Sequence, residues 1–518
     1  MRRRVRELEQ RRERVREMGG SERIKKQHAR GKLTARERMA LLFDDGVWFE
    51  VGLHGRAMGA AGDAGLVPAD GVLTGFGKVE GRMVCAAAYD FTVKGGSIGQ
   101  TGEVKVSRVR SMALQGRWPM VWLIDSAGAR IDAASQSHPD MLSLFAGSGH
   151  LFREQVTLSG LVPQVAAMMG PGAAGTAYIP GLADFVPMVA GVGSMALAGP
   201  PLVRAVTGEE IGEQALGGSK LHTQVSGVGD AEVEGDHACI ALVRRYLGFF
   251  PSHAGQAPPL LPVTDPVERR AETLLDIIPD NPRAPYDMYQ LIEQLVDHAE
   301  ILDIKAGFGG SLITCLARIG GRPLGIVANQ PLVLGGVLDN DASDKGAHFI
   351  QVCDAFGLPL VFLQDTPGFM VGSKVERAGI IRHGAKMLHA MSAATVPKLT
   401  VVVRKGYGAG YYVMCGRAYE PDLLVAWPGA EISVMGAEGM LGIAGRKLFG
   451  GVEPAPEVKA QIIERLQATI DIDRVAGWAL VDDVIDPRDT RLALAWGLEL
   501  TQHKRIERPA KKRGVMPV

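Results

Sequence analysis

MMGPGAAGTAY, from Met168 to Tyr178, carries the clearest structural signal in the chain. An apolar run typical of a buried strand, LVPQVAAMM, leads into it, and glycine and alanine follow where a helix would begin. A strand that ends in small residues before a helix leaves backbone N–H groups open, because small side chains let a ligand atom approach closely. Such a turn favours anions and developing oxyanions.

The second half of the chain repeats this arrangement. TVPKLTVVVRKGYGAGYYVM, residues 395–414, has an apolar strand behind a proline, and then Gly408, Ala409 and Gly410. The two strands begin alike, with LVPQV and TVPKL, and Gly175 and Gly410 are 235 residues apart. We therefore expect a second turn of the same kind.

A second pair of segments repeats upstream of these turns. WPMVWLIDSAGARI (118–131) is echoed by LPLVFLQDTPGFMV (358–371), so that Asp125 and Asp365 hold matching places after a strand, 240 residues apart. A period this long indicates a domain duplication rather than a solenoid.

Strand and helix signals alternate in both halves. Each half has two strands joined by a turn, at Glu80–Gly81 and at Gly320–Gly321, with a helix expected near 102–116 and near 342–356. This alternation predicts an α/β fold with a largely parallel core in each unit.

The proline-rich segment QAPPLLPVTDPVERR, residues 256–270, predicts an extended linker. It divides the chain into an N-terminal domain, 1–260, and a C-terminal domain, 261–518. The first 43 residues are expected to form charged helices, and Thr34 with Glu37 predicts a capping box at the start of one of them.

Composition excludes several classes of protein. The 518 residues include 57 Lys plus Arg and 57 Asp plus Glu, and this zero net charge argues against a nucleic-acid partner. No long apolar run predicts a membrane span. The five cysteines form no CxxC pair, so we expect neither a disulfide framework nor a metal site, and we expect a reducing cytoplasm.

Other catalytic patterns are weak. GPGAAG at 170–175 fits GxGxxG, but it comes late in its domain and Asp184 follows too soon to be the acidic residue of a dinucleotide site. His222 and His383 are isolated and read as structural residues. Glu431 and Glu438 follow the second turn, which keeps a crotonase-type hydratase open as an alternative.

A series of motifs in order gives the chain a family resemblance. They are GKLTARER (31–38), DFTVKGGSIG (90–99), DSAGARI (125–131), GPGAAGTAY (170–178), GGSKLH (217–222), GIIRHGAKML (379–388) and RKGYGAGYYVMCGRAY (404–419). With them the chain resembles, over nearly its whole length, the carboxyltransferase (β) subunits of biotin-dependent acyl-CoA carboxylases, the propionyl-CoA and 3-methylcrotonyl-CoA carboxylase group.

The resemblance implies a fold and a chemistry. It implies two tandem crotonase-like domains, with acyl-CoA mainly on the N-terminal domain and carboxybiotin mainly on the C-terminal one. It implies that N–H groups of Ala174 and Gly175 bind the enolate oxygen of the thioester, and that those of Ala409 and Gly410 bind the ureido oxygen of biotin. Further substrate contacts are expected from Gly128, Ala129, Arg130, Tyr178 and Tyr412.

The resemblance also implies partners. Biotin would be carried by a separate biotin carboxylase or biotin carboxyl carrier chain, since this chain has no MKM-type attachment sequence. A ring-shaped homohexamer is typical of the family, with an active site between the N domain of one subunit and the C domain of another.

Acyl specificity stays open at this stage. Tyr412 stands where propionyl and acetyl enzymes commonly have Asp, whereas GIIRHGAKML is propionyl-like. The alternatives are a 3-methylcrotonyl-type carboxylase, a decarboxylase or transcarboxylase subunit acting on a dicarboxylic acyl-CoA, and a scaffold that binds CoA without turnover.

Overall fold

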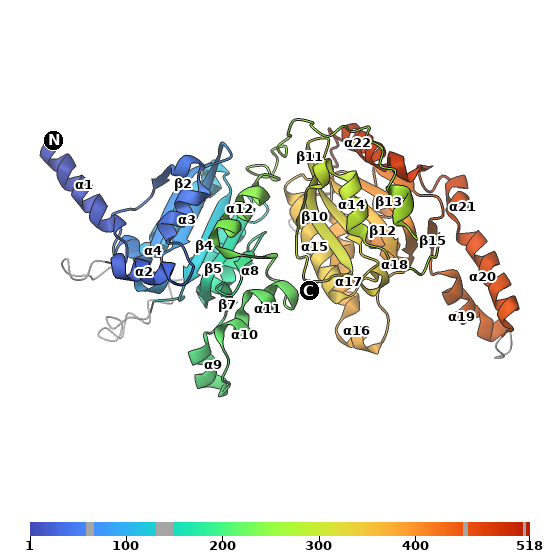
Figure 1. Cartoon of the computed structure of the whole chain (residues 1–518), viewed down its shortest axis with the longest axis horizontal. Coiled ribbons are helices and arrows are strands. Elements are labelled where there is room, and N and C mark those ends of the chain that lie inside the picture. The colour runs from blue at the N-terminus through green and yellow to red at the C-terminus, as the bar shows by residue number, and fades with distance from the viewer. Residues whose placement is uncertain (58–66, 131–148, 449–453, 511–513, 518) are drawn as a thin grey trace. The chain divides into compact units, whose positions relative to one another are not determined.

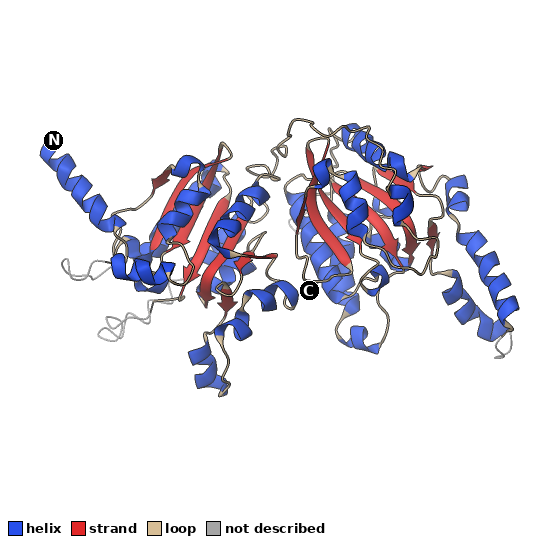
Figure 2. Ribbon diagram, viewed as in Figure 1, coloured by secondary structure: helices blue, strands red, loops and turns tan. Residues whose placement is uncertain are grey.

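The computed structural model describes residues 1–57, 67–130, 149–448, 454–510 and 514–517. The chain divides into two units, Met1–Ala257 and Pro258–Val518 (Figure 1). Each unit is built around one eight-stranded sheet with helices against it, as the secondary-structure colouring of Figure 2 shows.

The sheet of the first unit has the order β1-β2-β3-β4-β5-β6-β8, and β7 pairs with β5. The β1-β2 and β2-β3 pairs are antiparallel, and all the others are parallel. The strands are β1 Trp48–Glu50, β2 Val72–Val79, β3 Arg82–Tyr89, β4 Met120–Ser126, β5 Gln164–Ala173, β6 Pro187–Val189, β7 Ser194–Ala196 and β8 Ala231–Val233.

The sheet of the second unit has the same plan. Its order is β9-β10-β11-β12-β13-β14-β16 read from the other edge, and β15 pairs with β13. The strands are β9 Ile301–Asp303, β10 Leu312–Ile319, β11 Arg322–Asn329, β12 Leu360–Thr366, β13 Lys398–Tyr407, β14 Leu423–Ala426, β15 Glu431–Ser433 and β16 Asp483–Val484. The predicted α/β fold with a duplicated, largely parallel core is confirmed.

Helices connect the strands in both units. Those of the first unit are α1 Arg2–Arg16, α2 Ser21–His28, α3 Ala35–Leu42, α4 Gln100–Gly116, α7 His150–Leu158, α8 Gly175–Gly181, α9 Pro200–Thr207, α10 Glu213–Gly217, α11 Ser219–Gln224 and α12 Gly235–Leu247. Those of the second unit are α13 Leu274–Ile277, α14 Met288–Leu295, α15 Asn340–Ala355, α16 Ser373–Arg377, α17 Ile380–Ala393, α18 Gly408–Val413, α19 Ala437–Leu448, α20 Pro456–Ile470, α21 Ile472–Gly477 and α22 Thr490–Leu500.

The two predicted hairpin turns have the backbone that their residues favour. Glu80 and Gly81 both have positive φ (51° and 76°), and so do Gly320 and Gly321 (57° and 73°). Two successive residues in this region match the twist of the strands that they join. An aspartate before each sheet accepts hydrogen bonds from these turns. The Asp44 carboxylate accepts from the amides of Glu80 and Gly81, and the Asp297 carboxylate accepts from those of Gly320 and Gly321.

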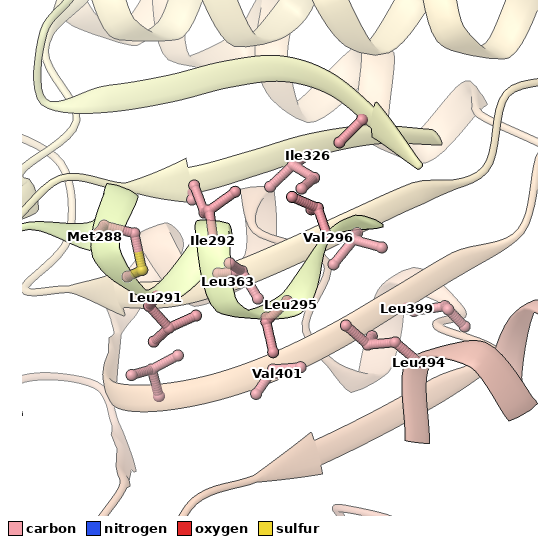
Figure 3. Packing of buried hydrophobic residues seen from close by; sticks show 14 of the residues in the cluster. Met288, Leu291, Ile292, Leu295, Val296, Ile326, Leu363, Leu399, Val401 and Leu494 are labelled. Carbon is pink, nitrogen blue, oxygen red and sulfur yellow. The ribbon is translucent and has the colours of Figure 1, made fainter. Parts of the chain in front are cut away.

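The core of the second unit lies between its sheet and α14 with α22. One face of α14 presents Met288, Leu291, Ile292 and Leu295, all buried, to Leu363 and Val401 of the sheet, while Leu494 of α22 packs beside Leu399 (Figure 3). These residues recur three and four positions apart along α14, which is the spacing of one helix face. In the first unit the cluster centres on Trp122, Met168 and Met188.

Two details differ from the sequence-based expectations. Strand β5 continues past Met169 to Ala173, so Gly170 and Gly172 lie inside a strand. Asp125 and Asp365 are likewise the next-to-last residues of β4 and β12 rather than residues after a strand. Strands β4 and β12 therefore each end in two polar residues that are still part of the sheet.

Candidate active site

The first turn begins where β5 ends. Ala174 follows the strand with φ 50° and ψ −116°, and α8 starts at Gly175. The amide of Ala174 donates to the carbonyl of Ala196 in the neighbouring strand at 3.1 Å. Gly175 is the first residue of the helix, where N–H groups have no acceptor inside the helix. Of the two predicted donors, Gly175 therefore has the freer amide.

The loop after β4 lies against this turn. A Cβ on Gly128, whose φ is +90°, would come 2.7 Å from the carbonyl oxygen of Ala173. The hydroxyl of Ser126 shapes the loop by accepting from the Gly128 amide at 3.1 Å and donating to the Gly96 carbonyl at 2.7 Å. Position 128 therefore requires glycine, because its φ is positive and a Cβ would clash with the Ala173 carbonyl.

Ala129 lies next in this loop and is exposed. The residues on both sides of it bond to Ile98: the Gly128 carbonyl accepts from the Ile98 amide at 2.8 Å, and the Arg130 amide donates to the Ile98 carbonyl at 3.1 Å. Within the described part of the chain, the Ala129 amide itself has no acceptor. It is a second open N–H group next to the first turn.

Arg130 has a different environment from the one predicted for a substrate ligand. Its guanidinium forms an ion pair with the buried Asp70 and donates to Ser97 Oγ at 3.0 Å and to the Ser97 carbonyl at 2.8 Å. A Cβ on Gly99 would lie 2.4 Å from Arg130 Nη1. Arg130 therefore ties the loop after β4 to its neighbours.

Tyr178 lies one turn into α8. Its side chain is 51% exposed and meets the ring of Phe152 edge on, with ring centroids 5.5 Å apart. Phe152 also lies 3.7 Å from where a Cβ on Gly175 would be. This aromatic pair flanks the open start of the helix.

The second turn is similar, but its helix α18 begins directly after the strand, one residue earlier than α8 does. Gly408, with φ +55°, follows β13, and Ala409 is exposed at the start of α18. The Gly368 amide donates to Thr366 Oγ1 at 3.1 Å, as Gly128 does to Ser126. A Cβ on Gly410 would lie 2.8 Å from Gly368 Cα, so this loop also lies against its turn.

Tyrosines border the second turn. Tyr412 is 46% exposed and stacks on Tyr419, with ring centroids 5.9 Å apart. Tyr411 lies edge on to Tyr412 at 6.2 Å, and its hydroxyl accepts from the Arg417 amide at 3.0 Å. The exposed ring of Tyr412 is thus fixed in place from both sides.

The strand register corrects the match between the turns by one residue. Gln164 lies opposite Met120, and Lys398 lies opposite Leu360, so the structural offset is 234 (398 minus 164). Ala174 therefore corresponds to Gly408, and Gly175 to Ala409. The shared glycine letter had matched Gly175 with Gly410, but pairing along the strand sets the position.

A buried charge network lies beneath the first turn. Asp125 accepts from Lys32 Nζ at 2.6 Å, from Arg38 Nη1 at 2.9 Å and from Gln27 Nε2 at 2.9 Å. Arg38 also binds Asp236 at 2.7 Å. Burial lowers the pKa of the Lys32 ammonium. Sequence reasoning missed this network, although GKLTARER contains both cations.

Beneath the second turn, Asp365 is paired differently. Arg404 Nε of the neighbouring strand binds its carboxylate at 2.9 Å. The Asp365 amide donates to Asn329 at 3.2 Å. Burial raises the pKa of this carboxyl.

The remaining candidate residues have structural partners. Glu431 binds the Tyr407 hydroxyl, and Glu438 forms an ion pair with Arg283. His222 lies within hydrogen-bond distance of the Met195 carbonyl (2.8 Å) and Ser226 (2.7 Å).

His383 contacts Asp344 at 2.9 Å on the neighbouring helix. The glycines of GPGAAG up to Gly172 lie in a strand, where a Cβ at Gly170 would come 2.0 Å from Asp125 Oδ1. The side chains of Glu431, Glu438, His222 and His383 each contact a neighbouring residue of their own unit.

In the described residues, no helix is long and apolar enough to cross a membrane.

Comparison with known proteins gives one consistent result. Residues 26–516 match the carboxyl transferase domain family. The chain is 43% identical over 517 residues to the methylmalonyl-CoA carboxyltransferase 12S subunit of Propionibacterium freudenreichii, covering 99% of this chain and 97% of that protein. It is 41% identical over 514 residues to the propionyl-CoA carboxylase beta chain of Roseobacter denitrificans, covering 99% of each.

Two further comparisons bear on substrate and structure. The chain is 41% identical over 502 residues to the methylmalonyl-CoA decarboxylase subunit alpha of Veillonella parvula, covering 96% of each. A crystal structure of transcarboxylase 12S, with methylmalonyl-coenzyme A and methylmalonic acid bound, superimposes with a TM-score of 0.93 at 42% identity, covering 99% of this chain and 98% of that one.

Proposed function

Because the chain belongs to the carboxyl transferase domain family, we propose that its two turns bind the two partners of one carboxyl transfer. The chain is a biotin-dependent carboxyltransferase that acts on an acyl-CoA. The observation that carries the proposal is the duplication itself. In each unit, small residues follow a long central strand and begin the next helix: Ala174 and Gly175 after β5, and Gly408 to Gly410 after β13.

The first turn takes the acyl-CoA in this proposal. Removal of a proton from the carbon next to a thioester puts negative charge on the thioester oxygen, and two N–H donors at that oxygen stabilise the charge. Gly175 supplies one donor. Ala129 supplies the second more readily than Ala174, because the Ala174 amide already has the Ala196 carbonyl as its acceptor.

The second turn fits the ureido group of biotin. Ala409 and Gly410 present backbone beside the Gly368 loop, where a Cβ on Gly410 would be only 2.8 Å from Gly368 Cα, so small residues keep the approach open. Bound carboxybiotin supplies the CO2 and the base that takes the proton. The chain supplies orientation and hydrogen-bond donors, which explains why no acid or base side chain stands out at either turn.

The proposed substrate is a short or branched acyl-CoA of the propionyl-CoA and methylmalonyl-CoA type. The curated relatives carry out carboxylation, decarboxylation or transcarboxylation of such thioesters by name, and these share one chemistry run in different directions. A 3-methylcrotonyl-type carboxylase is the second candidate, because Tyr412 replaces the Asp that is common in propionyl enzymes.

We propose that biotin is carried by a separate biotin carboxylase or carrier chain in the cytoplasm. The absence of an MKM-type attachment sequence from the 518 residues supports a separate carrier. A homohexamer is the proposed assembly, because the matching transcarboxylase 12S structure is described as a hexamer.

The experiment assigns the two turns to their substrates. Wild type, Tyr178→Ala and Tyr412→Ala are assayed for consumption of malonyl-CoA, methylmalonyl-CoA and 3-methylglutaconyl-CoA at varied free biotin. Tyr178→Ala should raise the KM for the thioester and leave the KM for biotin within about twofold, because it touches only the first turn. Tyr412→Ala should raise the KM for biotin.

Matched controls come from the same two rings. Tyr178→Phe and Tyr412→Phe keep the ring and its packing against Phe152 or Tyr419, so both should retain the wild-type KM values. Equal effects of both alanine variants on both substrates would refute the division of labour.

A further inference from the structure

The two units pair an equivalent buried aspartate with cations from different elements of the chain. Asp125 in the first unit and Asp365 in the second are both fully buried next to the end of a central strand. The cations of Asp125, Lys32 and Arg38, come from the segment before the sheet. The cation of Asp365, Arg404, comes from the adjacent strand β13.

The strand register shows that the position of Arg404 in the second sheet is occupied by a glycine in the first. Ser126 lies opposite Gly172, and Thr366 lies opposite Gly406, so Gly170 and Arg404 hold the same position in the two sheets. A Cβ on Gly170 would lie 2.0 Å from Asp125 Oδ1 and 2.7 Å from Lys32 Nζ. The absence of a side chain at position 170 therefore leaves room for the Lys32 ammonium beside Asp125.

The helices before the two sheets differ in the opposite sense, because the first carries an arginine where the second carries an apolar residue. Helices α3 and α14 are each eight residues long and precede the turns that contain Asp44 and Asp297. Arg38 is the fourth residue of α3, and Leu291 is the fourth residue of α14, where it packs in the apolar core. The first unit thus pairs an arginine on the helix with a glycine in the strand, and the second pairs a leucine with an arginine.

The network lies beneath both segments that form the first turn. Asp125 immediately precedes Ser126, whose hydroxyl fixes the Gly128 amide. Arg38 Nη2 donates to the carbonyl of Met169, in the strand that leads to Gly175, at 3.0 Å. One cation group therefore holds the ends of β4 and β5 together below the open amides.

We propose that Lys32 and Arg38 are positioning residues for the first turn, and that they perform for Asp125 the task that Arg404 performs for Asp365. They hold the open amides of Ala129 and Gly175 in a fixed relation, at which a thioester oxygen would bind. This inference rests on the proposed function of the first turn for its kinetic arm only. The exchange of charges between segment and strand stands on the structure of the chain alone.

The test removes the positive charge at position 32, before the sheet, and places one at position 170 in strand β5. The full-length variants are Lys32→Ala, Lys32→Arg, Gly170→Arg and the double variant Lys32→Ala/Gly170→Arg, with Arg38 kept throughout. Lys32→Ala leaves Asp125 short of a cation, and Gly170→Arg alone forces a second cation against Lys32, so each should lower the Tm. The double variant should have a higher Tm than Gly170→Arg alone, because removing Lys32 relieves the 2.7 Å contact with Lys32 Nζ, whereas the 2.0 Å contact with Asp125 Oδ1 is present in both variants.

The kinetic arm separates positioning from folding. With methylmalonyl-CoA or malonyl-CoA and free biotin, below the Tm of each variant, Lys32→Ala should lower kcat about tenfold or more while the KM for the thioester stays within about twofold, since misplaced donors weaken transition-state binding. Lys32→Arg should recover most of the lost kcat.

Arg36→Ala is the matched control. Arg36 lies on α3 beside Arg38 but pairs with Glu50 at 2.8 Å instead of with Asp125. It should lower the Tm and leave kcat unchanged.

The outcomes are distinguishable. A double variant with a Tm no higher than that of Gly170→Arg would overturn the charge exchange. A Lys32→Ala variant that loses Tm but keeps the wild-type kcat would overturn the positioning role. If the wild type itself consumes neither thioester with biotin, the proposed function fails, and the Tm comparison still decides the exchange.

Discussion

Ala174 and Gly408 occupy the same place in the two units, each directly after the last residue of the long central strand, and both have positive φ (50° and 55°). A positive φ at this place is thus adopted once by alanine and once by glycine. Since a residue with a Cβ is strained at positive φ, the first turn carries backbone strain at Ala174 that glycine avoids at position 408.

This difference predicts opposite effects of two substitutions on stability. Ala174→Gly should raise the free energy of unfolding by about 1 kcal/mol, because relief of about 1–3 kcal/mol of backbone strain exceeds the entropy cost of about 0.4–1 kcal/mol. Gly408→Ala should lower it, because the new Cβ would lie 3.1 Å from the Val434 carbonyl. Thermal unfolding of both variants checks this, and a lower Tm for Ala174→Gly would contradict it.

The open amide of Ala129 predicts a change in rate without a change in stability. Ala129→Pro removes an N–H that has no acceptor in the described part of the chain, and Gly128 before it tolerates a following proline. If this amide binds the thioester oxygen, kcat should fall by about 10²–10³. Ala129→Ser keeps the N–H and should keep the activity. A proline variant with the wild-type kcat would remove Ala129 from the site.

A buried lysine predicts the pH dependence of stability. Lys345 of α15 donates to the Phe308 carbonyl at 2.9 Å, and burial lowers the pKa of its ammonium to about 7. Between that value and the unfolded pKa, near 10.5, the unfolded chain binds more protons at this group. Stability should therefore rise with pH across this window, by up to about 1.4 kcal/mol per unit, and become flat below it.

Comparison with Lys345→Met isolates this group. The difference in unfolding free energy between wild type and variant should move in favour of the wild type as the pH rises from 7 to 9, while other titrating groups cancel. A difference that is constant over this range would show that Lys345 keeps its proton in the folded chain.

Local signals in the sequence predicted the elements that depend on a few neighbouring residues. The hairpin at Glu80–Gly81 follows from two residues that tolerate positive φ between alternating strands. The capping box of Thr34 and Glu37 is present, with the Glu37 amide donating to Thr34 Oγ1 at 3.2 Å and the carboxylate accepting from the Thr34 amide at 2.7 Å.

The charge network could not be predicted in this way. Lys32 and Arg38 lie in the charged N-terminal segment that was expected to form helices, yet their partner Asp125 is about 90 residues away and fully buried. Only the folded sheet brings them together.

The one-residue correction at the turns has a similar cause. Gly175 and Gly410 look equivalent because they share a letter, whereas the pairing of β5 with β4 and of β13 with β12 makes Gly175 equivalent to Ala409. Backbone register, which sequence spacing does not reveal, decides which residues of the two turns are equivalent.

The most direct measurement follows the consumption of malonyl-CoA, methylmalonyl-CoA and 3-methylglutaconyl-CoA by the purified chain, each with and without free biotin. If one turn holds the thioester and the other holds biotin, at least one thioester is decarboxylated only when biotin is present. Decarboxylation at the same rate without biotin, or hydration of an enoyl-CoA with no decarboxylation, would contradict the account.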